Sequence, residues 1–207
     1  QGNNPDIQNA ERTFVGSGVV INADAVDEGD GGKVIVWSDE ITRFYGTVNA
    51  RGGTQDGNGG FVEVSGKQLL DFHGRVDLTA SAGAGGTLLL DPLDIVLDNS
   101  TQTAPTDNTA PAADVAFGDA PAGGTTTIEI GDVVGFSELR LQATQDISLN
   151  ASMTMSNNNS VVFQAGRHVN INANLAVIGS GTISLTADAD FSGAGEIGRA
   201  SCRERVS

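Results

Sequence analysis

The residues best suited to acid–base chemistry are Arg75 and Asp77, which lie two positions apart in a short strand-like segment. On one strand, this spacing places both side chains on the same face. A site that cleaves an acidic polysaccharide needs several carboxylates stacked on one face, with a base nearby. The positions 28 residues earlier are Thr47 and Asn49, so no second carboxylate is expected beside Asp77. We interpret the pair as a surface ion pair of little energetic weight and expect no catalytic residue.

The two histidines do not form a predicted metal site. His73 takes the place of Tyr45 in its repeat, and His168 takes the place of Asp146. Neither has a cysteine or a second histidine at ligand spacing, as a zinc site would require. We expect both to be structural.

Acidic turns raise the question of calcium. The acidic residues Asp27, Glu28, Asp30 and Asp56 lie in glycine-rich turns, and calcium takes several oxygen ligands at about 2.4 Å. Neither the nonapeptide calcium repeat nor a twelve-residue EF-hand loop is present. We therefore expect no metal and no cofactor, and a calcium-stabilised domain stays open as an alternative.

The final stretch, IGRASCRERVS at 197–207, holds the only cysteine, Cys202, and three of the eleven basic residues. It resembles read-through translation of a sequencing adaptor, and we exclude it from functional reasoning as a scar. The remainder then has no cysteine, which suits an exported protein.

Charge and hydropathy exclude several classes of partner. The net charge of −15 disfavours nucleic acid and anionic lipid, which both attract positive surfaces. No run approaches the roughly 18 apolar residues of a membrane span, so no membrane insertion is expected. Trp37 and Tyr45 are the only candidates for an aromatic sugar platform. Because the chain opens on Gln1 without a signal peptide, we expect an interior fragment of a longer protein.

Repeats dominate the first half of the chain. The units GGKVIVWSDE at 31–40, GGFVEVSGKQ at 59–68 and GGTLLLDPLD at 85–94 recur at spacings of 28 and 26 residues. Phe44 aligns with Phe72, and Val48 with Val76, at the spacing of 28. Short strands and glycine turns at a period in the twenties predict a solenoid, since one unit cannot bury its own apolar face.

The second half keeps a period of 22. Residues 139–143 align with 161–165 and 183–187, and 147–151 align with 169–173. The odd-numbered apolar residues should point inward, and Met153 and Met155 should be core residues because they align with Leu175 and Val177. Asn150 and Asn172 should form a short ladder.

We expect an all-β fold, a right-handed parallel β-helix with coils of 22–28 residues and three short strands in each 22-residue coil. The predicted organisation is an irregular lead-in at 1–13, a long-repeat block at 14–97, a Pro/Thr/Ala/Asp-rich linker or excursion at 98–126, a 22-residue-repeat block at 127–196, and the excluded tail at 197–207.

The order of the short motifs is more specific than any one of them. They are Phe14-Val15-Gly16, Ala23-Asp24-Ala25, GGKVIVWSDE, RFYGTVNARGG at 43–53, GNGGFVEVSGK at 57–67, GTLLLDP at 86–92, QAGRHVNINA at 164–173 and ISLTADAD at 183–190. Residues 9–98 resemble the long-repeat region of filamentous-haemagglutinin-like exoproteins, which are large adhesins of Gram-negative bacteria, and 139–190 resemble the shorter repeats that follow there.

The resemblance implies two-partner secretion across the outer membrane by a β-barrel transporter, through a region absent from this chain. It also implies a cell-surface or extracellular fibre that mediates cell adhesion, with host or surface glycans or matrix as candidate partners. We expect this chain to be a non-enzymatic shaft segment that presents a distal binding region. The alternative is a carbohydrate-binding or carbohydrate-cleaving parallel β-helix exoprotein.

Overall fold

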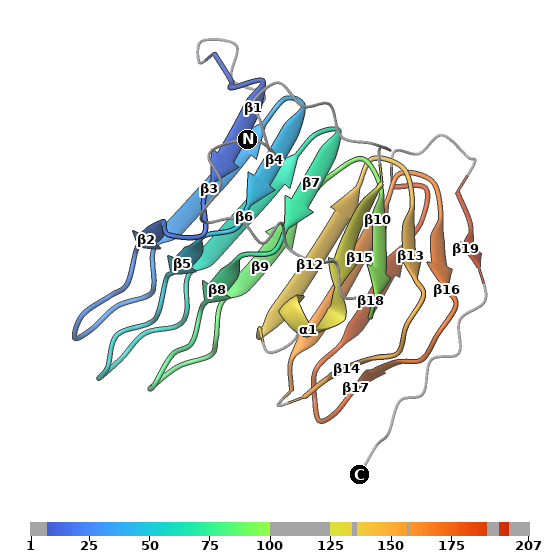
Figure 1. Cartoon of the computed structure of the whole chain (residues 1–207). Coiled ribbons are helices and arrows are strands. Elements are labelled where there is room, and N and C mark those ends of the chain that lie inside the picture. Colours follow the sequence, from blue (N-terminus) through green and yellow to red (C-terminus); the bar gives the residue numbers. More distant parts are fainter. Residues whose placement is uncertain (1–7, 100–124, 134–135, 157, 190–194, 199–207) are drawn as a thin grey trace.

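The computed structural model of the chain describes residues 8–99, 125–133, 136–156, 158–189 and 195–198. These residues form an all-β fold with 49% strand and 3% helix, and apart from β11 the strands follow one another along the molecule in the order of the sequence (Figure 1). Every pairing between described strands is parallel. The expected all-β class with parallel pairing is confirmed.

The first sheet is continuous and has six strands. In spatial order they are β3 (Lys33–Ser38), β6 (Phe61–Gly66), β9 (Thr87–Leu90), β12 (Glu138–Ala143), β15 (Ser160–Ala165) and β18 (Ile183–Thr186). Val34 pairs with Val62 and Val62 with Leu88, as the repeats predict. Leu139 pairs with Val161 and Val161 with Ile183, again as predicted.

The second sheet has two parts. The first part holds β1 (Arg12–Val15), β4 (Ile41–Phe44) and β7 (Leu69–Phe72). The second part, in spatial order, holds β11 (Thr126–Glu129), β10 (Ile95–Asp98), β13 (Ile147–Leu149), β16 (Val169–Ile171) and β19 (Ile197–Gly198). β11 follows β10 in the sequence but precedes it in the spatial order of this sheet.

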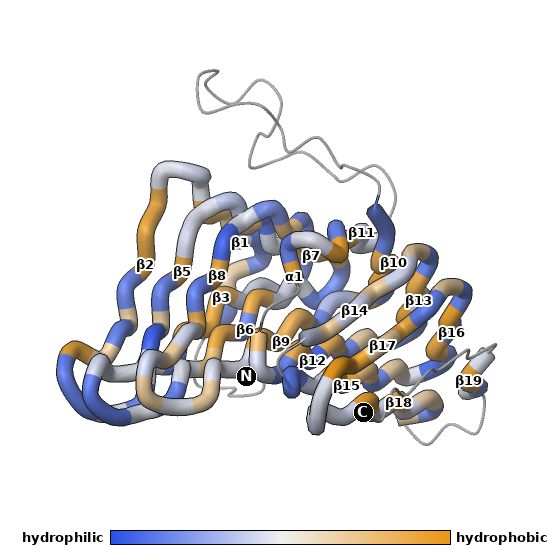
Figure 2. The backbone as a smooth tube through the Cα atoms, turned by 90° about the horizontal axis from the view of Figure 1, so that it is seen from below, coloured by the Kyte–Doolittle hydropathy of each residue, from blue (hydrophilic) through white to orange (hydrophobic). Residues whose placement is uncertain are grey.

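The third set of strands is also divided. It consists of β2 (Val20–Asn22), β5 (Thr47–Asn49) and β8 (Arg75–Asp77), and of β14 (Met153–Met155) with β17 (Leu175–Val177). A short helix, α1 (Ile130–Val133), lies between the two groups (Figures 1 and 2). The predicted matches of Met153 with Leu175 and of Met155 with Val177 are confirmed, and both methionines are fully buried.

Glycines make the close stacking of the long repeats possible. A Cβ on Gly60 would lie 2.1 Å from the carbonyl oxygen of Gly32, and a Cβ on Gly86 would lie 2.0 Å from that of Gly60. Both distances are far below van der Waals contact, so only glycine permits this approach. The repeated glycine pairs therefore fix where the β3, β6 and β9 repeats begin.

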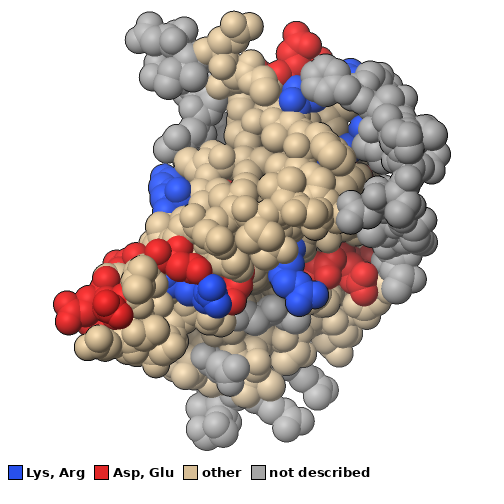
Figure 3. All heavy atoms as spheres, turned by 60° about the vertical axis from the view of Figure 1, so that its left-hand side comes forward, with Lys and Arg blue, Asp and Glu red and all other residues tan. Residues whose placement is uncertain are grey.

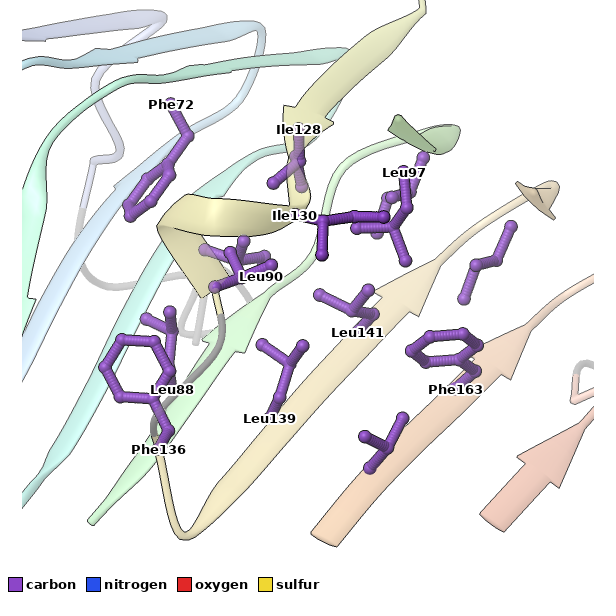
Figure 4. Close-up of a cluster of buried hydrophobic side chains, with 14 of the residues drawn as sticks. Phe72, Leu88, Leu90, Leu97, Ile128, Ile130, Phe136, Leu139, Leu141 and Phe163 are labelled. Atoms are coloured by element: carbon purple, nitrogen blue, oxygen red, sulfur yellow. The ribbon is translucent and has the colours of Figure 1, made fainter. Parts of the chain in front are cut away.

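A single apolar core runs between the sheets. In β12 and β15 the odd-numbered residues are buried and the even-numbered ones are half-buried, as expected. Phe44 and Phe72 stack with ring centroids 5.6 Å apart. Figure 4 shows Ile130 and Phe136 projecting into the same cluster as the strand residues, which closes the core beside α1.

Glu63 is buried although it carries a carboxylate. It alternates with Val62 and Val64 and so lies on the opposite side of its strand, yet its exposed fraction is only 6%. Its register neighbours on that side are apolar, Ile35 and Leu89. Strand alternation fixes the side on which a residue lies but not what covers that side.

The boundaries of the predicted blocks shift slightly. β1 begins at Arg12, inside the expected irregular lead-in, and β11 begins at Thr126, inside the expected linker. The two residues of β19 pair with Val169 and Asn170 although they belong to the stretch interpreted as an artefact. Residues 100–124 and 199–207, which include Cys202, lie outside the described residues.

A buried hydroxyl network lies at the corner between β3 and β4. The hydroxyls of Ser38 and Thr42 are 2.9 Å apart, and Thr42 donates to the carbonyl oxygen of Ser65 at 2.6 Å. All three residues are fully buried. In the part of the chain that the structure describes, every buried side-chain nitrogen and oxygen has a partner. This network ties β3, β4 and β6 together where the chain changes sheets.

Replacing Thr42 with valine should remove both hydrogen bonds while keeping the shape of the side chain. A buried hydroxyl and a buried carbonyl then lose a partner, so the free energy of unfolding should fall by about 1–3 kcal/mol in urea titrations. Thr154→Val, the same change at an exposed position of β14, is the control and should shift it by less than about 0.5 kcal/mol. Equal effects of the two changes would show that the buried network adds nothing.

Candidate functional site

A depression on the described surface lies between β8 and α1, and we call it the junction groove. Its volume is about 980 Å³. One wall is formed by residues of β8 and the turn after it, such as Val76, Leu78 and Ala84. The other wall is formed by Asp132 and by residues that directly precede β12 and β15. No described strand occupies the space between β8 and β14 in the third set.

The groove exists because the chain changes its winding after β10. The next described segment, β11, pairs with β10 on its outer side, and the Thr126 hydroxyl accepts a hydrogen bond at 2.9 Å from the Leu70 N–H of β7. α1 follows β11 without a break. Its apolar residues Ile130 and Val133, together with Phe136, are buried. They belong to the apolar core cluster, and Phe136 also lines the groove. Figure 4 shows Ile130 and Phe136 in this cluster.

A Tyr–Asp–His cluster lies at one end of the groove. The Tyr45 hydroxyl donates to Asp71 at 2.5 Å, and His73 Nε2 lies 3.2 Å from the other oxygen of Asp71. The hydrogen bond to Asp71 raises the pKa of His73. Burial acts to raise the pKa of Asp71, but hydrogen bonds from His73 and Tyr45 outweigh it and lower that pKa. Burial and the bond to Asp71 raise the pKa of Tyr45. The cluster is a closed network that needs no ligand.

The opposite wall carries one acid, Asp132. Burial and the nearby carboxylate of Glu129 raise the pKa of Asp132, while His73 and Arg75 act to lower it. The two acids therefore repel each other, and the surrounding cations offset that repulsion only in part. An added positive group in the groove would stabilise both carboxylates.

The predicted pair of Arg75 and Asp77 lines the groove. Their register neighbours on β5 are Thr47 and Asn49, as expected, so no carboxylate stacks beside Asp77 in the sheet. Asp77 accepts hydrogen bonds from both the hydroxyl and the N–H of Thr79, at 2.7 and 3.0 Å, and lies 4.0 Å from Arg51. Its contacts are thus with Thr79 and Arg51, and the arrangement is that of a surface cluster.

The other histidine and the aromatic candidates lie apart. His168 is in the turn before β16, where its Nδ1 accepts a hydrogen bond from Glu196 N–H at 3.2 Å. Trp37 is half-buried on β3, far along the first sheet from the groove, and Tyr45 belongs to the cluster described above. The structure therefore brings His73, Arg75 and Asp77 to one groove but leaves His168 and Trp37 outside it.

The acidic turns lie side by side without converging. Glu28 and Asp56 form a parallel backbone bridge, and Asp30 accepts hydrogen bonds from the backbone and side chain of Asn58 at 2.7 and 3.1 Å. Asp27 is exposed. Among the described residues no three His, Cys, Asp or Glu side chains are placed to share a metal ion. Figure 3 shows charged side chains of one face gathered in a band, with acidic and basic atoms beside each other.

Polar ladders run along the outside of the strands. Asn172 donates to Asn150 at 2.9 Å, which confirms the predicted asparagine ladder. Asn49 donates to Asn22 at 2.8 Å and Gln142 is bonded to Gln164 at 2.6 Å, two further ladders of the same kind. These bonds join like residues of neighbouring repeats and stabilise the stacking without a ligand.

Sequence reasoning missed two features of the site. Asp71 aligns with Arg43 at the spacing of 28 and lies two residues before His73, so its contact with both Tyr45 and His73 was available from the repeat alignment. Asp132 and Phe136 lie in no repeat, and no sequence signal places them. Outside the groove, the carboxyl of Asp91 has its pKa raised to about 6 by burial and by the charge of Glu63.

Comparison with known proteins leaves the family unassigned. The sequence matches no protein-family model and no curated protein. None of the described helices is long and apolar enough to cross a membrane. The geometry alone supports a binding groove beside an open strand edge, on an otherwise regular parallel scaffold.

Asp91 should make the protein less stable as pH rises. A carboxyl whose pKa is higher in the folded state than its ordinary 3.8 stabilises the fold below that value and loses the contribution as pH rises through about 6. The loss should reach at most about 3 kcal/mol. Asp91→Asn should flatten the unfolding free energy between pH 4 and 6 in urea titrations, while the exposed Asp56→Asn should keep the wild-type slope. An unchanged slope in Asp91→Asn would contradict the assignment.

Chelation should leave stability unchanged. The acidic turns already accept hydrogen bonds from N–H groups of the chain, so calcium removal takes away no required partner. Thermal melts followed by circular dichroism, with calcium and then with excess EDTA, should give the same midpoint within about 1 °C. A fall of several degrees that is restored by calcium would assign these turns to a metal site.

Proposed function

We propose that the chain is a segment of a right-handed parallel β-helix, with coils of 22–28 residues, that serves as the shaft of a secreted, cell-surface filamentous adhesin. The observation that carries the proposal is the parallel, in-register stacking of three sets of strands. Strands of the first set pair at offsets of 28, 26 and 22 residues, which are the repeat lengths of the sequence.

Stacked strands suit a load-bearing rod. Backbone hydrogen bonds between parallel strands run along the stacking direction, and each round of the chain is held by several of them. The continuous apolar core and the outer polar ladders add to this resistance. The net charge of −15 keeps neighbouring rods apart.

The remaining parts of the proposal rest on the family resemblance. They are secretion through an outer-membrane β-barrel transporter, recognised by a region outside this chain, and adhesion through a distal region that the shaft presents. In this role the chain has no enzymatic activity. The surroundings of Asp77, with Asn49 as register neighbour and Arg51 and Thr79 as contacts, favour this shaft over a carbohydrate-cleaving exoprotein.

A shaft segment should be exchangeable. We expect that the full chain, spliced in place of a shaft segment of a filamentous adhesin of this type, leaves surface display and cell adhesion intact, as measured by flow cytometry and cell binding. The control carries Leu141→Asp, which places a charge in the core and should abolish display. Loss of display with the unaltered chain, or binding of target cells by the purified chain alone, would contradict a shaft role.

A further inference from the structure

The edge of β8 facing the junction groove offers unpaired backbone groups. Arg75 N–H donates to Gly46 at 2.9 Å, and the carbonyl of Asp77 accepts from Ala50 N–H at 2.9 Å, so both residues are bonded toward β5. Backbone groups alternate in direction along a strand. The N–H and C=O of Val76 are therefore directed away from β5, toward the groove, where no described strand pairs with β8.

No described strand occupies the space beside this edge. In the first sheet β9 lies between β6 and β12. In the third set, β8 follows β6 in the sequence and β14 follows β12. No described strand of the third set lies between β8 and β14. α1 lies between these two strands, and the groove of about 980 Å³ remains between β8 and α1. The core beneath is already closed by Val133 and Phe136, so a guest would add to the surface without entering the core.

The walls favour a basic guest. Asp132 lines the groove at an exposed position, and the carboxylate of Glu129 contributes to its raised pKa. His73 and Arg75 also line the groove and act against that effect. A lysine or arginine side chain beside Asp132 would be attracted to both carboxylates. The net charge of −15 also draws cationic peptides toward the molecule from a distance.

We propose that the junction groove binds an extended basic peptide segment of a partner protein, which adds a strand to β8 through the N–H and C=O of Val76. In this mode the main-chain bonds give affinity, and alternate side chains give specificity. Every second side chain of the bound peptide would lie over Val76 and Phe136, and the remaining side chains would face Asp132. The proposal is independent of the shaft role, since it rests only on the β8 edge and the groove.

The probe is a fluorescein-labelled, end-blocked hexapeptide, Thr-Val-Lys-Val-Thr-Val amide, titrated with the full chain and followed by fluorescence anisotropy. Two companions are the same peptide with glutamate in place of lysine, and one with proline in place of the central valine. We expect the lysine peptide to bind more tightly than the glutamate peptide, and the proline peptide to bind at least ten-fold more weakly than the lysine peptide, because proline cannot donate to the edge.

Val76→Pro removes the proposed donor from β8 while leaving the bonds to β5 in place. Binding of the lysine peptide should weaken roughly ten-fold. Val20→Pro is the matched control: β2 is also an edge strand, and Thr47 N–H donates to Val19 there, so the N–H of Val20 points away from β5. This control should bind as the wild type does, with both folds checked by thermal melts.

A second variant fills the groove without touching β8. A Cβ at Gly131 would meet no atom closer than 3.9 Å, so Gly131→Leu should fold normally and weaken binding by a similar factor. Asp132→Asn should weaken binding of the lysine peptide about three-fold and should not weaken binding of the glutamate peptide.

Weaker binding in Val76→Pro and Gly131→Leu, with Val20→Pro unchanged, would establish the site. The proposal is overturned if the wild type binds none of the peptides, or if Gly131→Leu binds as tightly as the wild type. It is equally overturned if an oligosaccharide array is bound in their place, since that result assigns the groove to carbohydrate.

Discussion

Parallel, in-register pairing between repeats is the constraint on which the structure depends. A strand such as β6 has its backbone groups satisfied by β3 on one side and β9 on the other, and a shift by one residue would turn Val62 and Val64 away from the core. Register is therefore held by several independent devices. The stacked glycines at 32, 60 and 86 prevent displacement at one corner, and the Ser38–Thr42–Ser65 network fixes another.

The same constraint explains the junction. When β11 is added between β7 and β10, the second sheet gains a strand that the first sheet does not have. The third set, by contrast, has no described strand in the round that contains β9. An apolar core cannot remain open at such a place, so α1 and Phe136 supply the missing cover. The groove lies next to α1 and Phe136, because these residues fill less space there than a further strand and its turns would.

The sequence predicts the strand pairing only in the parts of the chain that repeat. Where units recur, the alignment gives the pairing residue by residue, as for Phe44 with Phe72 and Leu139 with Val161. Across the break it cannot, because β9 pairs with β12 at an offset of 51 residues that corresponds to no period. β11 pairs with β10 and α1 follows it directly, and neither belongs to a repeat that could be aligned. Nor does alternation reveal that Glu63 is covered, since covering depends on other segments.

An open strand edge in a repeat protein normally invites pairing with another copy of the same chain. At the groove this outcome is opposed by geometry and by charge. The β8 edge lies between α1 and the turn that contains Ala84, so a flat sheet edge of a second molecule has no straight approach to it. Copies of a chain with a net charge of −15 also repel one another. A single extended segment of opposite charge meets neither obstacle, so the features that protect the edge from self-association also select the kind of partner it admits.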